Sequence, residues 1–146
     1  MSAMTVLITG NLGYIGSVLT PILGQRGHQV RGFDNGFFRD CLLTPVDEPP
    51  EQITKDIRDI ERKDLEGVTA VVHLAGLSND PLGELDESLT EAINYDASMR
   101  LGELARRMGT RRLVYASSQS MYGRSATGIE LEEDTSEKNP LTAYAK

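Results

Sequence analysis

Short apolar runs alternate with helix-like patterns along most of the chain. Thr69–Leu74 is apolar at nearly every position, as expected for a strand that is covered on both faces. Strands of this kind that alternate with helices predict a parallel sheet, because parallel neighbours need a crossover connection. The predicted strands are an apolar run that begins at Val6, Gln29–Phe33, Gln52–Lys55, Thr69–Leu74 and Leu113–Ser117.

Apolar residues at helical spacing predict three helices between these strands. The first follows residues 10–16 and contains Pro21, which is expected either to kink it or to shorten its hydrogen bonding. A brief second helix ends at about Leu65, with Asp59 as a candidate cap. The third runs from about Glu87 to Met108. The stripe expected to pack the first helix on the sheet is Ile15, Val18, Leu19, Ile22 and Leu23.

The order of these elements predicts an α/β fold, a doubly wound parallel sheet with strand order 3-2-1-4-5. A chain of 146 residues fits one ordinary domain. In this arrangement the carboxyl ends of the first and fourth strands flank the point where ligands bind. Gly10, Asp34, Ala75 and Ser118 should therefore lie along one edge of the sheet.

Three glycines spaced three apart, Gly10, Gly13 and Gly16, follow the first strand and lead into a helix. A helix N-terminus at such a turn presents unpaired N–H groups to an anion. The glycines permit the turn, the approach of a diphosphate and close packing of helix on strand. A glycine-rich turn without a ligand is the alternative for the bare pattern.

Asp34 ends the second predicted strand, 18 residues after Gly16 (34 − 16). An acidic residue near this spacing accepts hydrogen bonds from the adenosine ribose of NAD, and its charge repels the 2′-phosphate of NADP. The sequence Asp34-Asn35-Gly36 also forms a good turn by itself, and the two interpretations are compatible. A long surface loop is expected from 36 to 50, where prolines interrupt any periodicity.

Three other polar residues stand out along the chain. Asp56 follows the third predicted strand and is either a ligand contact or a turn former. His73 is expected to be a packed core histidine rather than a catalytic one. A surface position is the default for Asn94 on its helix. Ala75 and Gly76 are small enough to let a cofactor lie against the backbone.

The composition excludes several classes of function. A net charge of −7 argues against nucleic-acid binding, and 39% hydrophobic with 25% charged residues is typical of a soluble globular protein. No membrane span or signal-peptide pattern is present, so a cytoplasmic protein is expected. The single Cys41 and two histidines predict neither a disulfide nor a metal site.

Together these motifs resemble the extended short-chain dehydrogenases/reductases, and within them the NAD-dependent nucleotide-sugar epimerases and dehydratases. The resemblance covers the whole chain, and several motifs in the right order are more specific than any one. It rests on Gly10-x-x-Gly13-x-x-Gly16, Asp34-Asn35, Asp56-Ile57, His73-Leu74-Ala75-Gly76, Asn94, the serine run ending in Tyr122-Gly123, and Asn139-Pro140-Leu141-Thr142-Ala143-Tyr144.

The resemblance implies NAD as cofactor and a nucleotide sugar as substrate, with a homodimer as an option and no nucleic-acid or membrane partner. Ser118 and Tyr144 match the family's catalytic serine and tyrosine base. Hydride removal from a sugar carbinol needs such a base and a second donor that steadies the oxygen. The implied cofactor-binding residues are Gly10, Leu12, Gly13, Tyr14, Ile15, Gly16, Asp34, Asn35, Asp56, Ile57, Leu74, Ala75, Gly76, Asn94 and Ser117.

The sequence departs from the family at its end. The family's lysine, four residues after the tyrosine, would fall at position 148, and Lys146 is only two residues after Tyr144. The expectation is therefore one NAD-binding domain over 1–146, truncated before that lysine and the substrate domain, with weak catalysis at best and an exposed fifth strand.

Two residues narrow the expected reaction. Gln119 and Ser120 stand where the family's dehydratases carry an acidic pair, which favours an epimerase or a sugar dehydrogenase or reductase. A steroid-type reductase, and a non-catalytic NAD-binding or oligomerising module, remain as alternatives.

Overall fold

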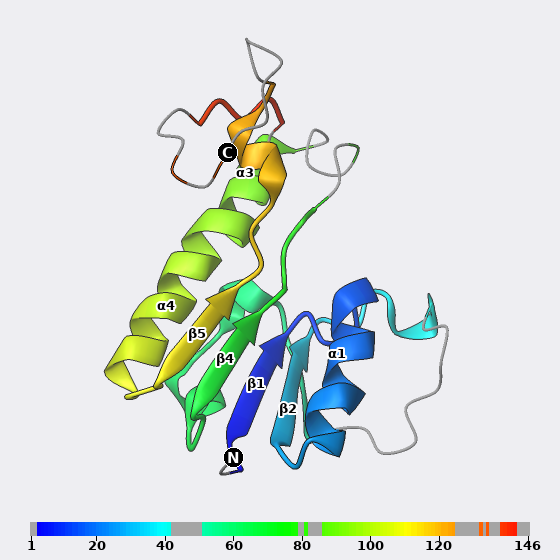
Figure 1. The fold of residues 1–146 in the computed structure, drawn as a ribbon, viewed down its shortest axis with the longest axis vertical. Helices are drawn as coiled ribbons and strands as arrows, with labels where there is room; N and C mark the ends of the chain where they lie inside the picture. The colour runs from blue at the N-terminus through cyan, green and yellow to red at the C-terminus, as the bar shows by residue number, and fades with distance from the viewer. Residues whose placement is uncertain are drawn as a thin grey trace.

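The computed structural model of the chain describes residues 3–41, 51–78, 81, 86–124, 132, 134 and 138–142. A five-stranded parallel sheet with the order β3-β2-β1-β4-β5 forms the centre of the fold (Figure 1). This confirms the predicted class and strand order. The strands are β1 (Thr5–Thr9), β2 (Gln29–Asp34), β3 (Glu51–Thr54), β4 (Ala70–His73) and β5 (Arg112–Tyr115).

The register aligns the carboxyl ends of the central strands. Thr9 at the end of β1 pairs with Phe33 of β2 and with His73 of β4. His73 in turn pairs with Tyr115 of β5. The segments that follow β1, β2, β4 and β5 therefore leave the sheet at one edge, as predicted for the candidate site.

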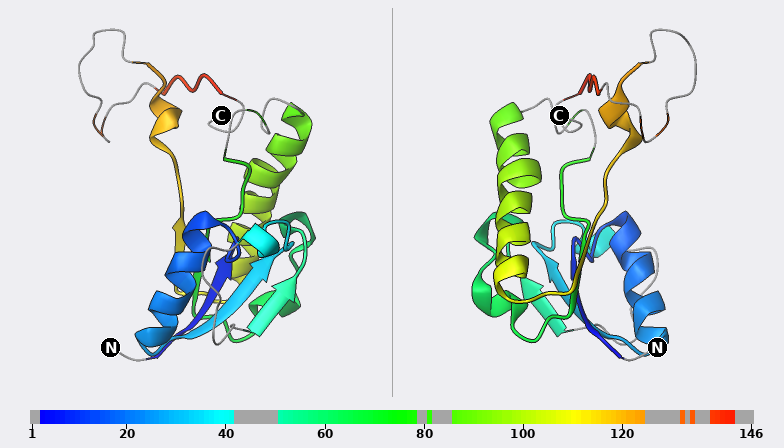
Figure 2. Two further views of the ribbon diagram at one scale, coloured as in Figure 1. Left: turned by 90° about the vertical axis from the view of Figure 1, so that its right-hand side faces the viewer. Right: turned by 60° about the vertical axis from the view of Figure 1, so that its left-hand side comes forward.

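Helices cover both faces of the sheet, with α1 (Tyr14–Gln25) on one face and α4 (Ala97–Arg107) on the other (Figure 2). The predicted helix Glu87–Met108 comprises α3 (Glu87–Glu91), the π-helical turn η4 (Ala92–Asp96) and α4 in succession. Shorter 3₁₀ turns are η1 (Arg39–Cys41), η2 (Ile57–Asp59), η3 (Arg62–Leu65) and η5 (Gln119–Tyr122). Of the loop predicted over 36–50, residues 42–50 lie outside the described residues.

The brief helix predicted before Leu65 is two 3₁₀ turns, each with its own cap. The Asp56 carboxylate caps η2 by accepting a hydrogen bond from the backbone N–H of Arg58. Glu61 and Asp64 form a capping box at η3. The prediction that Asp59 caps this helix is wrong, because Asp59 lies inside η2.

The two core clusters lie on opposite faces of the sheet. Alternate residues of β1 supply both, since Leu7 faces α4 whereas Val6 and Ile8 face α1. This alternation explains why β1 is apolar at successive positions. The larger cluster comprises Leu7, Phe33, Ile57, Ile60, Leu65, Val68, Val71, Ala97, Leu101 and Ala105, and the smaller one Val6, Ile8, Val30 and Ala70.

The predicted buried stripe of α1 is partly wrong. The buried residues of α1 are Gly16 and Thr20, with Leu23 packed against the smaller cluster. Ile15, Val18 and Ile22 stay 40–60% exposed. The helix is apolar on most of its circumference, so periodicity could not select its face. It continues through Pro21 without a break.

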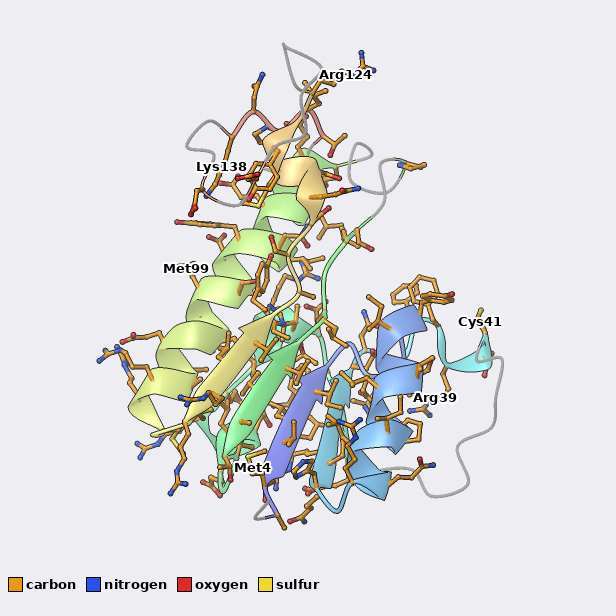
Figure 3. The ribbon with its side chains drawn as sticks, in the orientation of Figure 1. Met4, Arg39, Cys41, Met99, Arg124 and Lys138 are labelled. Atoms are coloured by element: carbon orange, nitrogen blue, oxygen red, sulfur yellow. The ribbon has the colours of Figure 1, made fainter. Side chains whose placement is uncertain are left out.

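Two further observations limit the kinds of site. In the described part of the chain, no three His, Cys, Asp or Glu side chains could together hold a metal ion. No helix in the described ranges is long and apolar enough to cross a membrane. Figure 3 shows Cys41 at the outer margin of the molecule beside α1, where its thiol is free and exposed.

Candidate functional site

The chain turns sharply at Gly10, between the ends of β2 and β4. The Gly10 N–H donates to the carbonyl of Phe33 over 2.8 Å, and its φ of +73° is in the region that favours glycine. A Cβ at this position would lie 2.7 Å from the backbone nitrogen of Ala75. Only glycine therefore fits where the backbone passes between the neighbouring strands.

Gly16 has an equally strict steric role in the first turn of α1. A Cβ there would overlap the carbonyl oxygen of Gly10 and lie 2.6 Å from Cα of Asn11. A Cβ at Gly13 would meet only the Gly10 carbonyl, at 3.3 Å. The fold thus demands the first and third glycines, and Gly13 leaves open backbone at the start of α1, where no side chain caps the helix.

The Asp34 carboxylate lies beside this turn. Its Oδ2 accepts a hydrogen bond from the Leu12 N–H at 3.1 Å, and its Oδ1 accepts one from the Gly36 N–H at 2.8 Å. Asn35 is exposed, and its Oδ1 accepts from the Phe37 N–H at 3.0 Å. The turn-forming interpretation of Asp34 is confirmed. The same bonds fix a partly exposed carboxylate next to the glycine turn.

The turn also contains residues with very different burial. Tyr14 and Ile15 are 87% and 59% exposed at the start of α1, where a ligand on the turn could reach them. Asn11 is 2% exposed, and its amide bonds to Gln52 on β3. The pairing of Asn11 with Gln52 could not be predicted, because neither an amide inside a glycine motif nor a glutamine on a strand signals a partner.

His73 ends β4 and is buried, with 2% of its surface exposed. Its Nδ1 lies 2.6 Å from Oγ1 of Thr9, and its Nε2 lies 2.9 Å from Oγ of Ser98 on α4. Burial lowers its pKa to about 4, which keeps the ring neutral at physiological pH. The prediction of a packed core histidine is confirmed.

Asn94 does not have the surface role that was the default. From the π-helical turn η4, its Oδ1 accepts from the Leu77 N–H at 2.8 Å and its Nδ2 donates to the Leu77 carbonyl at 2.9 Å. A Cβ on Gly76 would approach Asn94 Oδ1 to 3.1 Å. A π-helical turn shifts the helix register, so regular helical spacing places this side chain wrongly.

Asp56 and Ile57 follow the end of β3. Both carboxylate oxygens of Asp56 accept from the Arg58 guanidinium, at 2.8–2.9 Å, and this pairing lowers the pKa of Asp56. The Ile57 side chain belongs to the larger core cluster and is 6% exposed. Their contact with an adenine stays a prediction.

Ser117 and Ser118 follow β5, where the chain rises beyond the sheet edge (Figure 1). The Ser118 hydroxyl caps η5 by accepting from the Ser120 N–H at 3.2 Å, and Ser117 Oγ lies 3.6 Å from Sδ of Met121. Gly123 ends η5 with a φ of +68° and packs directly against the Asn139 carbonyl. Segment 138–142 therefore returns to the serine segment. Tyr144 and Lys146 lie outside the described residues.

The arrangement provides open backbone N–H groups at a helix start, a fixed carboxylate and a serine hydroxyl beyond one sheet edge. Leu74 and Ala75 lie between them, with the Ala75 N–H bonded to Thr9 Oγ1 at 3.3 Å. Such a set suits a ligand with a diphosphate and a diol. The fold and this turn define a Rossmann-like dinucleotide-binding class of α/β domain.

Residues 6–146 match the model of the NAD dependent epimerase/dehydratase family, and the chain belongs to this family. It is 31% identical over 145 residues to a UDP-glucose 4-epimerase of Corynebacterium glutamicum, covering 97% of this chain and 42% of the relative. It is 34% identical over 145 residues to an ADP-L-glycero-D-manno-heptose-6-epimerase of Cupriavidus pinatubonensis, again covering 97% and 42%.

Solved structures of epimerases share the fold. A UDP-N-acetylglucosamine 4-epimerase from Methanobrevibacter ruminantium, in complex with UDP-N-acetylmuramic acid, superposes with a TM-score of 0.87 at 28% identity, covering 99% of this chain and 47% of that one. A UDP-glucose 4-epimerase from Thermus thermophilus in complex with NAD gives 0.79 at 30% identity, covering 97% and 46%. The chain spans less than half the length of these relatives.

Proposed function

We propose that residues 1–146 are the NAD-binding domain of an NAD-dependent nucleotide-sugar epimerase. The observation that carries the proposal is the Asp34 carboxylate, bonded to the Leu12 N–H beside a turn whose first and third glycines are sterically required. Family membership and the epimerases among the relatives support the reaction class.

In this proposal the diphosphate of NAD lies against the backbone of 10–16 at the start of α1, and Asp34 accepts the hydroxyls of the adenosine ribose. Asp56 and Ile57 flank the adenine. The backbone of 74–76 lines the path toward the nicotinamide, and Asn94 acts on that path through its bonds to Leu77.

NAD, when bound, supplies the hydride acceptor that takes a hydride from the sugar and returns it. The chain's own groups handle the proton and the oxygen. Tyr144 takes the proton of the sugar hydroxyl, and the Ser118 hydroxyl donates to the oxygen as its charge develops. For this the Ser118 hydroxyl must turn the proton that it donates to the Ser120 hydroxyl, over 3.1 Å, toward the substrate, while it keeps the bond that it accepts from the Ser120 N–H.

The cofactor assignment is tested by titration with NAD and NADP. Asp34→Asn removes the charge and one acceptor at nearly constant size, and we expect NAD affinity to fall roughly tenfold. The preference for NAD over NADP should narrow as well, because the repulsion of the 2′-phosphate is lost. Glu66→Gln is the matched charge control, because Glu66 is exposed and does not lie at the sheet edge that carries the glycine turn. Tighter binding of NADP than NAD by the unaltered chain would refute the assignment.

The reaction is tested on the complete enzyme to which these residues belong. An epimerase converts a UDP- or GDP-sugar to its epimer with no net change in NADH. Net NADH accumulation would favour a dehydrogenase, and relatives support this second candidate. The chain is 31% identical to a 3 beta-hydroxysteroid dehydrogenase of Mycobacterium tuberculosis over 134 residues and 33% identical to a D-erythronate dehydrogenase of Cupriavidus necator over 152 residues.

A further inference from the structure

A hydrogen-bond relay runs through the buried ring of His73 and joins three elements. Thr9 Oγ1 at the end of β1 lies 2.6 Å from His73 Nδ1, and His73 Nε2 lies 2.9 Å from Ser98 Oγ on α4. The Ser98 hydroxyl lies 2.6 Å from the carbonyl oxygen of Asn94 in the π-helical turn. At the other end, the Ala75 N–H reaches Thr9 Oγ1 over 3.3 Å.

Counting protons fixes the direction of every bond in this relay. The Asn94 carbonyl can only accept, so the single hydroxyl proton of Ser98 points to it. Ser98 Oγ must then accept from His73, which places the ring proton on Nε2. The bare Nδ1 accepts the proton of Thr9, and the lone pairs of Thr9 Oγ1 are left to accept from the N–H groups of Leu74 and Ala75.

Both ends of the relay act on the same short segment. Thr9 holds the Ala75 N–H, while Asn94, whose carbonyl ends the relay, holds both backbone groups of Leu77 with its side chain. Residues 75–77 are thus fixed at two points. Because Ala75 also packs against Gly10, a shift of this segment would be felt at the glycine turn.

We infer that His73 is a positioning residue for the cofactor. The hydrogen bonds of the relay all donate in one direction, from Ala75 to Asn94, and they hold residues 75–77 in the conformation that binds NAD. The inference rests on the proposed NAD binding. The groups that face the ring are the hydroxyls of Thr9 and Ser98 and the tilted ring of Tyr115 from β5, 5.5 Å away between centroids. The bonds described for His73 include no charged partner, so the ring works as a neutral donor and acceptor.

A matched set of variants in the full chain tests this role. Thr9→Val keeps the shape but removes the hydroxyl, and Ser98→Ala removes the acceptor of Nε2–H. We expect each to weaken NAD binding roughly tenfold, with Thr9→Ser restoring it. Leu104→Ala, a change in the larger core that spares the relay, should destabilise the chain without altering NAD affinity where it is folded.

Nitrogen NMR of the ring supplies a readout that packing alone would not move. At pH 7 we expect the His73 proton on Nε2 in the unaltered chain and in Thr9→Ser, and a mixture of tautomers in Ser98→Ala. A proton on Nδ1, or NAD affinity unchanged in both Thr9→Val and Ser98→Ala, would overturn the positioning role of His73 but leave the proposed function standing. Absence of NAD binding by the unaltered chain would overturn the proposed function, and the positioning role with it.

Discussion

The side-chain amides of Asn11 and Gln52 bond to each other in both directions. Asn11 Nδ2 lies 2.9 Å from Gln52 Oε1, and Gln52 Nε2 lies 3.3 Å from Asn11 Oδ1. The pair crosses β2 at Gly32, where a Cβ would overlap both amides. The glycine turn is therefore tied to the outer strand β3 across a strand that must carry no side chain there.

A double-mutant cycle should detect this coupling. Asn11→Ala and Gln52→Ala should each lower the free energy of unfolding by about 1–2 kcal/mol, because each removes both bonds between the buried Asn11 amide and the half-buried Gln52 amide. The double variant should lose less than the sum, with a coupling of roughly 1 kcal/mol. Urea unfolding of the four proteins measures this. Strict additivity would contradict a direct interaction.

A pair of glycines in α1 separates steric need from backbone flexibility. Gly16→Ala should destabilise the chain by about 1–3 kcal/mol, since its Cβ would overlap the Gly10 carbonyl. Gly24→Ala meets nothing within 4 Å and should stabilise it by roughly 0.5–1 kcal/mol through helix propensity. Thermal unfolding of both variants gives the comparison. Equal effects would mean that helix α1 does not pack on the turn as described.

The strands could be predicted because each depends on local signals, and their order follows from the rules for doubly wound parallel sheets. The apolar run at Thr69–Leu74 indicated a strand buried on both faces, and β4 is an inner strand between β1 and β5. The spacing of Gly10, Gly13 and Gly16 indicated a sharp turn, and two of the three prove indispensable for steric reasons. Asp34 could be predicted because the crossover through α1 fixes how far beyond the glycine turn strand β2 ends.

The parts that escaped prediction depend on choices that a single segment does not encode. Helix α1 is apolar on most sides, so its own sequence does not determine which face it buries. The close contact of Gly16 with Gly10 determines that face. Asn94 reaches Leu77 only because a π-helical turn displaces it. The partner of Asn11 lies 41 residues away on another strand, beyond any local pattern.

The buried His73 should make stability fall as the solution becomes acidic. Its pKa is lowered from 6.5 to about 4 by burial, so between these values the unfolded chain binds a proton that the folded chain excludes. The free energy of unfolding should therefore drop as pH falls from 6.5 to 4, by at most about 3 kcal/mol. Urea unfolding at intervals of pH measures this slope.

The histidine can be separated from other acid-sensitive groups. The pKa values of Glu61 and Glu103 are lowered to about 2 by their lysine and arginine partners, so their contribution is lost below pH 4.5, outside most of this window. His73→Asn should flatten the slope between pH 6.5 and 4.5, whereas the destabilised Leu104→Ala should keep it. An unchanged slope in His73→Asn would assign the effect to another group.

The outer strand β5 pairs with β4 on one side and, in the part of the chain that the structure describes, with no strand on the other. Leu113, Val114 and Tyr115 are 42%, 58% and 51% exposed. An apolar edge of this kind pairs with other chains, and a lysine on an edge strand opposes such pairing.

We expect the 146-residue chain to self-associate and Val114→Lys to shift it toward monomer in sedimentation velocity over a range of concentrations. Met99→Lys is the matched control, because Met99 is 61% exposed and belongs to helix α4 rather than to a strand. Loss of association in Met99→Lys but not in Val114→Lys would place the contact on the helix face, and a chain that is monomeric at every concentration would contradict the prediction.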